Sequence, residues 1–295
     1  MEIISNNDSD LPLRPRPVVL LLLDGYGIAP ASEANAISET ETKYLNNLLK
    51  EYPVAILNPG DKSLNARYLS LGTGKDFNNE NEETGKTLTE IISRSGLKQL
   101  KIMEAERLAA LTHFFNSHLE ERLVGEEWMT VSSEIKNIVK PSLFLKRMLK
   151  EINKAVHSDN YDFITIALPV LDQVAQDGTF EEIKKILGEI DNGLKKIVST
   201  VLGKKGVLMI SSTHGNIERM KNLAADFDDT KMTDNSVPLI IVGEEFAGKT
   251  IGLAEPIDND LSLLTPAGTL ADIAPTILKI MNLNKPVEMT GESLV

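Results

Sequence analysis

The sequence predicts an α/β fold in which a mainly parallel central sheet carries helices on both faces. Apolar runs without polar alternation are typical of strands buried on both faces, and such runs lie at 18–23, 163–168, 206–211 and 237–242. Longer segments with helical periodicity separate them, at 87–95, 142–157, 180–202, 217–225 and 269–281. Strands that alternate with helices favour parallel pairing, so the sheet should be covered on both sides.

The first strand is the best-marked element. Residues 1–14 are polar and end among prolines, which predicts a flexible lead-in before a single domain at 15–295. The run 18–23 then ends in DGYG at 24–27, where the glycines allow a sharp turn. Asp24 should therefore lie at the carboxyl end of a buried strand, where α/β sheets place their chemistry. A helix at 42–51 and a short strand at 54–57 should follow.

One segment departs from this composition. Residues 76–83 read DFNNENEE and are almost entirely polar. A stretch of this kind buries little apolar surface, so we expect a surface loop that adds nothing to the core.

Composition excludes several classes of function. The chain has 295 residues, 42% of them hydrophobic, and a net charge of −12, which disfavours nucleic-acid binding. It has no cysteine, so thiol nucleophiles and cysteine–zinc sites are excluded. The start of the chain shows no basic and apolar leader, and the longest apolar run, 18–23, is too short to span a bilayer. We expect a soluble, cytoplasmic protein without membrane insertion.

Motifs spread along the chain point to a family. They are PVVLLLLDGYGI at 17–28, NAI at 35–37, LGTGK at 71–75, GLKQLKI at 96–102, THFFN at 112–116, HGNIERM at 214–220, LADIAPT at 270–276 and EMTGESL at 288–294. Together, and in this order, they resemble the cofactor-independent phosphoglycerate mutases, members of the alkaline-phosphatase-like metalloenzyme superfamily. The resemblance implies the alkaline-phosphatase-like fold.

The resemblance also implies a metal site, and this sequence keeps only part of it. The family transfers a phosphoryl group through a phosphoserine with two Mn²⁺-type ions, which carboxylates and imidazoles bind. Asp24, Asp172 and His214 match ligand positions of the family. Other positions of the family's site are replaced: the serine nucleophile by Leu64, two histidine ligands by Gln176 and Met232, and an aspartate by Thr213.

Two further residues are candidates for a remnant of the chemistry. Ser63 lies one position before Leu64 and is the candidate for a shifted nucleophile. Arg107 occupies the position of a family lysine; it cannot act as an acid or base, but it can bind a phosphate. Structural roles remain open for the ligand-like residues. Asp24 and His214 could serve the turns in which they lie, and Asp172 with Gln176 could form a polar patch on a helix.

The sequence lacks a whole domain that the family has. In the mutases a substrate-binding domain is inserted between the motifs that match 71–75 and 96–102, but only residues 76–95 lie there in this chain. We therefore expect a pseudoenzyme with a structural or regulatory role, bound to a protein partner, to a second copy of itself or to an active mutase. The alternative is a reduced phosphatase or phosphomutase with one weakly held Mn²⁺, Mg²⁺ or Zn²⁺ ion. No other cofactor is expected.

Overall fold

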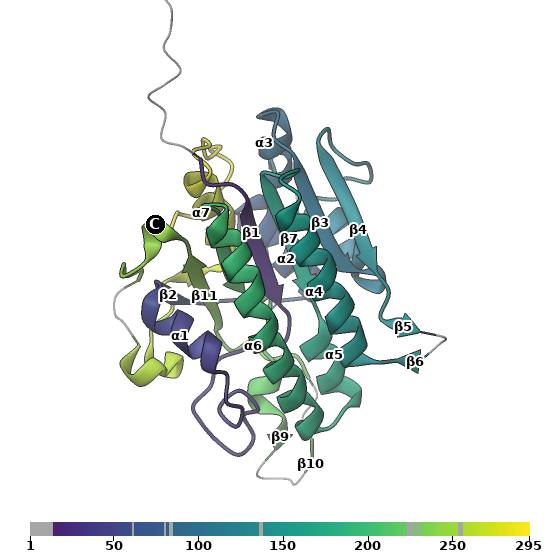
Figure 1. The fold of residues 1–295 in the computed structure, drawn as a ribbon. Helices are drawn as coiled ribbons and strands as arrows, with labels where there is room; N and C mark the ends of the chain where they lie inside the picture. Colours follow the sequence, from purple (N-terminus) through teal and green to yellow (C-terminus); the bar gives the residue numbers. More distant parts are fainter. Residues whose placement is uncertain are drawn as a thin grey trace, which may run out of the picture.

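The computed structural model describes residues 14–60, 62–79, 81–82, 85–135, 138–222, 227–228, 231–252 and 256–295. Within them, eight strands form one central sheet in the order β12-β2-β11-β8-β1-β7-β3-β4 (Figure 1). Their bounds are β1 Val18–Leu23, β2 Val54–Asn58, β3 Gln99–Glu104, β4 Glu126–Val131, β7 Phe163–Leu168, β8 Val207–Ser211, β11 Val237–Val242 and β12 Gly268–Thr269. The predicted lead-in lies outside the described residues, apart from Arg14.

β1 lies inside the sheet and pairs in parallel on both sides. Val18 is opposite Phe163 of β7 on one side and Val207 of β8 on the other. β3 and β4 continue the parallel part beyond β7, whereas β11 runs antiparallel to both β8 and β2. The prediction of a mainly parallel sheet is confirmed, with β11 as the reversed strand.

Helices cover both faces of the sheet, as predicted (Figure 1). The first face carries α1 (Lys43–Glu51), α4 (Pro141–His157), α5 (Val170–Asp177) and α6 (Phe180–Gly203). The second carries α2 (Leu64–Thr73), α3 (Leu88–Arg94) and α7 (Ile273–Ile280). Side chains of β1 alternate between the two hydrophobic clusters, so every residue of the strand is buried. None of the helices in the described residues is both long and apolar enough to cross a membrane.

Several elements are absent from the sequence-based prediction. Strands β3 and β4 were not predicted because each contributes a charged residue to the interior. These residues, Lys101 and Glu126, are buried and form an ion pair of 2.9 Å. Helix α2 was also not expected, although Ser63 marks its start. The short pairs β5 (Glu134–Ile135) with β6 (Ile138–Val139), and β9 (Lys221–Asn222) with β10 (Phe227–Asp228), lie outside the central sheet.

The predicted helix at 217–225 is wrong over its described part. A single 3₁₀ turn, Ile217–Arg219, is followed by β9, and residues 223–225 lie outside the described residues. The backbone donors of this segment are bound elsewhere: the amide of Ile217 donates to Gly25 (3.0 Å) and that of Met220 to Ala34 (2.8 Å). In a helix that starts at Ile217, the amide of Met220 would instead donate to the carbonyl of Asn216.

The polar segment 76–83 also differs from expectation in one respect. Its described residues form no helix or strand, but Phe77 is only 2% exposed. The ammonium of Lys75 lies 5.0 Å from the centre of its ring. The one aromatic residue of this segment is therefore buried, and the expectation that the segment adds nothing to the core is wrong.

Candidate functional site

The candidate site lies where three neighbouring parallel strands end. Asp24 follows β1, Asp172 lies in the first turn of α5 after β7, and Thr213 and His214 follow β8. The turns are tied together by their backbones, since the amide of Asp172 donates to Asp24 (3.3 Å) and that of Asn216 to Gly25 (3.0 Å). The sheet therefore brings the three retained ligand positions to one place, as their positions in the sequence predict.

Asp24 is fully buried, and each of its carboxylate oxygens accepts a hydrogen bond. The Tyr68 hydroxyl donates to Oδ2 (2.6 Å) and the Thr213 hydroxyl to Oδ1 (2.7 Å). Burial raises the pKa of Tyr68 well above its ordinary value, and the charge and hydrogen bond of Asp24 raise it further. Tyr68 therefore keeps its proton and remains a donor to Asp24.

Asp172 accepts from four side chains. His214 (3.2 Å) and Asn216 (3.0 Å) lie on Oδ1, while Arg107 (2.8 Å) and Gln176 (3.2 Å) lie on Oδ2. Burial alone would raise the pKa of Asp172. The hydrogen bond and charge of His214, with Asn216 and Arg107, outweigh burial and hold it well below the usual range.

His214 contacts the site through both ring nitrogens. The Thr213 hydroxyl donates to Asp24, and its oxygen lies 2.8 Å from Nδ1 of His214. The other ring nitrogen, Nε2, lies 3.2 Å from the carboxylate of Asp172. The ring therefore links the residues that follow β1, β7 and β8.

Arg107 supplies a positive charge to the site. It comes from a short 3₁₀ turn, Ala105–Arg107, directly after β3, and its side chain is 22% exposed. Burial would lower its pKa, but the charges of Asp24 and Asp172 raise it above the ordinary value. The residue singled out as a phosphate-binding candidate is therefore paired with a carboxylate of the site itself.

The remaining candidates lie apart from this network or serve it differently. Ser63 caps α2, because its hydroxyl accepts from the amide of Ala66 at 3.2 Å. Leu64 begins the same helix and packs against the second hydrophobic cluster. Met232 is 39% exposed. Gln176 contacts Asp172 through its amide nitrogen, which is a donor and not a metal ligand.

Two members of the network were not predicted from the sequence. Tyr68 comes from α2, which lies on the second face of the sheet. Asn216 lies two residues after His214 in the HGN motif. Tyr68 stands where the family's G-N-S-E-V-G-H motif has its last histidine in the ungapped register. That replacement was the available signal for it.

These residues do not fit the family's pair of metal ions. Within the described part of the chain, no group of three or more acidic or histidine side chains is arranged to hold a metal. The retained carboxylates are instead engaged with side chains of the chain itself, namely two hydroxyls, an imidazole, two amides and a guanidinium. A cation bound at Asp172 would lie beside the guanidinium of Arg107, which is 2.8 Å from that carboxylate, and like charges repel strongly in a buried site.

Solved structures of other proteins confirm the alkaline-phosphatase-like fold. The alkaline phosphatase of the Antarctic bacterium TAB5 matches with a TM-score of 0.62, over 92% of this chain and 99% of that chain, at 12% identity. A phosphoglycerate mutase of Leishmania mexicana matches with a TM-score of 0.58, over 72% of this chain and 39% of that chain, at 21% identity. At such identities the likeness concerns the fold alone.

Curated relatives and a family model give the assignment. The chain is 35% identical, over 216 residues, to the 2,3-bisphosphoglycerate-independent phosphoglycerate mutase of Clostridium botulinum, and 33% identical over 219 residues to that of Methanococcoides burtonii. It spans about 40% of the length of these relatives. Residues 16–285 match the family model described as the metalloenzyme superfamily. The chain belongs to the metalloenzyme superfamily and is similar to the phosphatase-type part of these mutases.

Proposed function

We propose that this chain is a pseudoenzyme: a member of the superfamily that has no mutase activity and serves a structural or assembly role. The observation that carries the proposal is the pairing of the two retained carboxylates. Asp24 and Asp172 are bound by donors of the chain itself.

The charge balance of the site supports this proposal. Buried carboxylates need nearby positive charge or several donors, because burial disfavours the ionised form. In a metalloenzyme the ions supply that charge. Here the guanidinium of Arg107 supplies it to Asp172. An incoming Mn²⁺ would have to displace Arg107 from that carboxylate.

The residues at the position of the family's serine nucleophile also support the proposal. A phosphoserine mechanism needs a hydroxyl close to the metal ions, and the matching position is the apolar Leu64. The neighbouring Ser63 uses its oxygen to cap α2. In addition, only residues 74–98 lie between α2 and β3, where the family carries its substrate-binding domain, and α3 is the helix among those of them that the structure describes.

The assembly role follows from what the chain has kept. The motifs that hold the fold are near-literal matches to the family, while the positions of the metal site are not. We expect the partner to be another protein or a second copy of this chain. The alternative is a phosphatase that uses one ion at Asp24, Asp172 and His214, with water or Ser63 as the nucleophile.

Restoration of the lost ligands tests the proposal. Titration calorimetry with Mn²⁺ should give no binding heat for the wild-type chain, and hydrolysis of an aryl phosphate should stay at the uncatalysed rate. The variant R107K/Q176H/T213D/M232H should bind Mn²⁺, because it restores the family's residues around Asp24 and Asp172. The matched control carries T213N in place of T213D, which keeps the size of that side chain but removes its charge, and it should bind more weakly.

The opposite result would favour the alternative. Stoichiometric Mn²⁺ in the wild-type chain, together with phosphatase turnover that Asp24→Asn abolishes, would contradict the pseudoenzyme. For the assembly role, sedimentation of the wild-type chain and affinity capture from a lysate provide the measurement. A clean monomer that captures no protein would count against it.

A further inference from the structure

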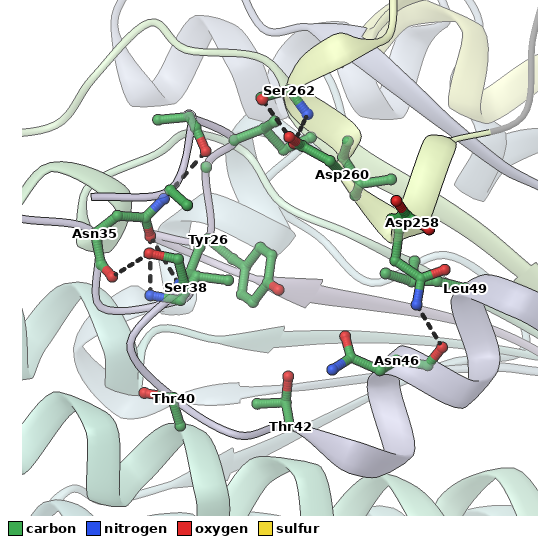
Figure 2. A pocket seen from close by; sticks show the side chains of 17 residues that line it. Tyr26, Asn35, Ser38, Thr40, Thr42, Asn46, Leu49, Asp258, Asp260 and Ser262 are labelled. Carbon is green, nitrogen blue, oxygen red and sulfur yellow. Dashed lines mark hydrogen bonds between the residues drawn. The ribbon is translucent and has the colours of Figure 1, made fainter. Parts of the chain in front are cut away.

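A polar pocket lies near the end of β1, and neither Asp24 nor Asp172 lines it. It has a volume of ≈ 330 Å³ and opens between the loop that follows β1, the start of α1 and the turn at 258–262 (Figure 2). Tyr26, two residues after Asp24, projects into it (Figure 2). This volume is at the lower end of the range of small-molecule sites.

Two hydroxyl groups on largely buried side chains face this pocket. Tyr26 is 7% exposed and Thr42 is 4% exposed, and both hydroxyls point toward the middle of the space (Figure 2). Among the described residues, neither side chain forms a hydrogen bond, although both line the pocket. Neither oxygen is among the fully buried unpaired atoms, so both hydroxyls are open to the pocket and available to a ligand in it.

The position of Thr42 makes its unused hydroxyl more informative. Thr42 is the N-cap residue of α1, where a threonine normally binds the first amides of the helix, but its side chain makes no such bond. Asp191 of α6 takes over that role, accepting from the amides of Leu45 (2.7 Å) and Tyr44 (3.1 Å). The Thr42 hydroxyl is therefore left to the pocket.

The charge of the pocket selects against anions. Asp258 and Asp260 lie on its wall, and no lysine or arginine is among the residues that line it. Asp260 accepts from the amide (2.9 Å) and hydroxyl (2.6 Å) of Ser262, while the Asp258 carboxylate accepts no hydrogen bond within the described residues. Burial, and to a lesser extent Asp191, raises the pKa of Tyr26, so its hydroxyl is neutral. A phosphate group would meet the negative charges of Asp258 and Asp260 and no cationic side chain of the lining.

The remaining walls of the pocket are apolar. The turn that bears Asp258 and Asp260 is fixed against α1. Ile28, Ile37, Leu49 and Leu261 line the pocket between its polar groups. The side chain of Asn259 donates to the carbonyl of Asn46 at 3.2 Å, which ties the turn that bears Asp258 to α1 (Figure 2). Carboxylates and hydroxyls beside apolar walls match an ammonium group on a methylene chain, since an ammonium has three donors and no acceptor.

We propose that this pocket binds a small aliphatic amine of the diamine class, with one ammonium group held by Asp258, Asp260 and the hydroxyls of Tyr26 and Thr42. This site is separate from the phosphoryl-transfer site and does not depend on whether that site is active. Its ligand is a cation, whereas the family's reaction concerns phosphorylated acids.

Binding of 1,4-diaminobutane, measured by titration calorimetry at moderate salt, tests the proposal. The wild-type chain should bind one equivalent. Asp258→Asn should weaken binding at least about tenfold, because it removes the carboxylate that has no other partner. Tyr26→Phe should weaken it about threefold to tenfold, because it removes only the hydroxyl. Glucose and inorganic phosphate should not bind.

A matched control separates the pocket from the general acidity of the protein. Glu39 is an exposed acid in the same loop that does not line the pocket, and Glu39→Gln makes the same change of charge as Asp258→Asn. It should change the affinity less than about twofold. Equal losses in the two variants, binding that Tyr26→Phe leaves unchanged, or preferential binding of glucose or phosphate would each overturn the proposal. Circular dichroism of each variant confirms that it is folded.

Discussion

The C-terminal clamp, by which we mean residues 268–276 and 288–294, can be compared directly with the site at the end of β1. Both regions consist of motifs that match one family, and both are rich in polar contacts. In the clamp, Asp272 accepts from the amides of Thr269 and Glu292, each at 2.7 Å, and the motif is nearly identical to the family's. At the site, the polar residues bind one another, and several of the family's positions carry other residues.

The two regions differ in the groups that their polar side chains bind. Polar side chains of the clamp satisfy backbone amides, and the fold needs these bonds because a buried amide without a partner is costly. Asp24 and Asp172 are instead bound by side chains, among them Tyr68, Thr213 and Arg107. The comparison predicts large effects of mutation in the clamp and smaller, pH-dependent ones at the site.

The largest effect should come from Gly291→Ala in the clamp. A Cβ atom at Gly291 would lie 2.3 Å from the carbonyl oxygen of Ala271 and 2.7 Å from its carbon, so the backbone must move. We expect a loss of about 3 kcal/mol in the free energy of unfolding, measured by urea denaturation. The control is Gly188→Ala in α6, where no atom lies within 4 Å; it should stabilise the protein by about 0.5–1 kcal/mol. A tolerated Gly291→Ala would show that the clamp is not rigid.

A smaller loss is expected from Asp272→Ala. The substitution leaves two backbone amides, those of Thr269 and Glu292, without their acceptor. We expect a loss of about 2 kcal/mol in the free energy of unfolding, again from urea denaturation. Asp272→Asn keeps one acceptor oxygen and should lose about half as much. Equal losses in the two variants would mean that the charge of Asp272, and not its hydrogen bonds, stabilises the clamp.

At the site at the end of β1, Tyr68→Phe tests the same comparison. It removes the donor to Oδ2 of Asp24 and leaves the ring in place, so a buried carboxylate oxygen loses its partner. We expect a loss of about 1–2 kcal/mol in thermal or urea unfolding. The matched control is Tyr161→Phe, which removes a similar 2.7 Å bond to Glu127 at an exposed position and should cost less than about 0.5 kcal/mol. If Tyr68→Phe is neutral, the donors at Asp24 do not replace the metal ions in stabilising the site.

The resemblance to the family predicted the gathering of Asp24, Asp172 and His214, and the strands that they follow lie side by side in the sheet. The sequence did not predict Tyr68, and it gave Arg107 another role. These residues come from a helix and a 3₁₀ turn whose place depends on how whole elements pack. The role of Arg107 shows the limit well. A guanidinium can bind a phosphate or a carboxylate, and only the 2.8 Å contact with Asp172 decides between them.

The missed strands have a similar physical cause. Lys101 and Glu126 are charged, so the pattern of polarity argues against two buried strands. The fold neutralises them against each other at 2.9 Å, and Asn116 donates to the same carboxylate at 3.0 Å. Burial lowers the pKa of Lys101 to about 8, while Glu126 partly offsets that effect. Pairing across strands is a property of the fold, and no local pattern in the sequence shows it.

The smallest predicted effect concerns the acid range and depends on Asp172. Its folded-state pKa lies well below the ordinary value, so the unfolded chain binds more protons than the folded one as the solution becomes acidic. The stability that Asp172 contributes is complete above about pH 5 and is lost as the pH falls toward the folded pKa. Between pH 5 and pH 3, the difference in free energy of unfolding between the wild-type chain and Asp172→Asn should shrink by about 1 kcal/mol.

Urea denaturation at a series of pH values measures this difference, and Asp177→Asn provides the control, because Asp177 is exposed on the same helix. The control should keep a constant difference from the wild type over this range. A gap that stays unchanged or widens for Asp172→Asn would mean that its carboxylate is not held ionised by Arg107 and His214. The site would then lack the internal charge pairing that distinguishes it from the clamp, and its carboxylates would again be available to a metal ion.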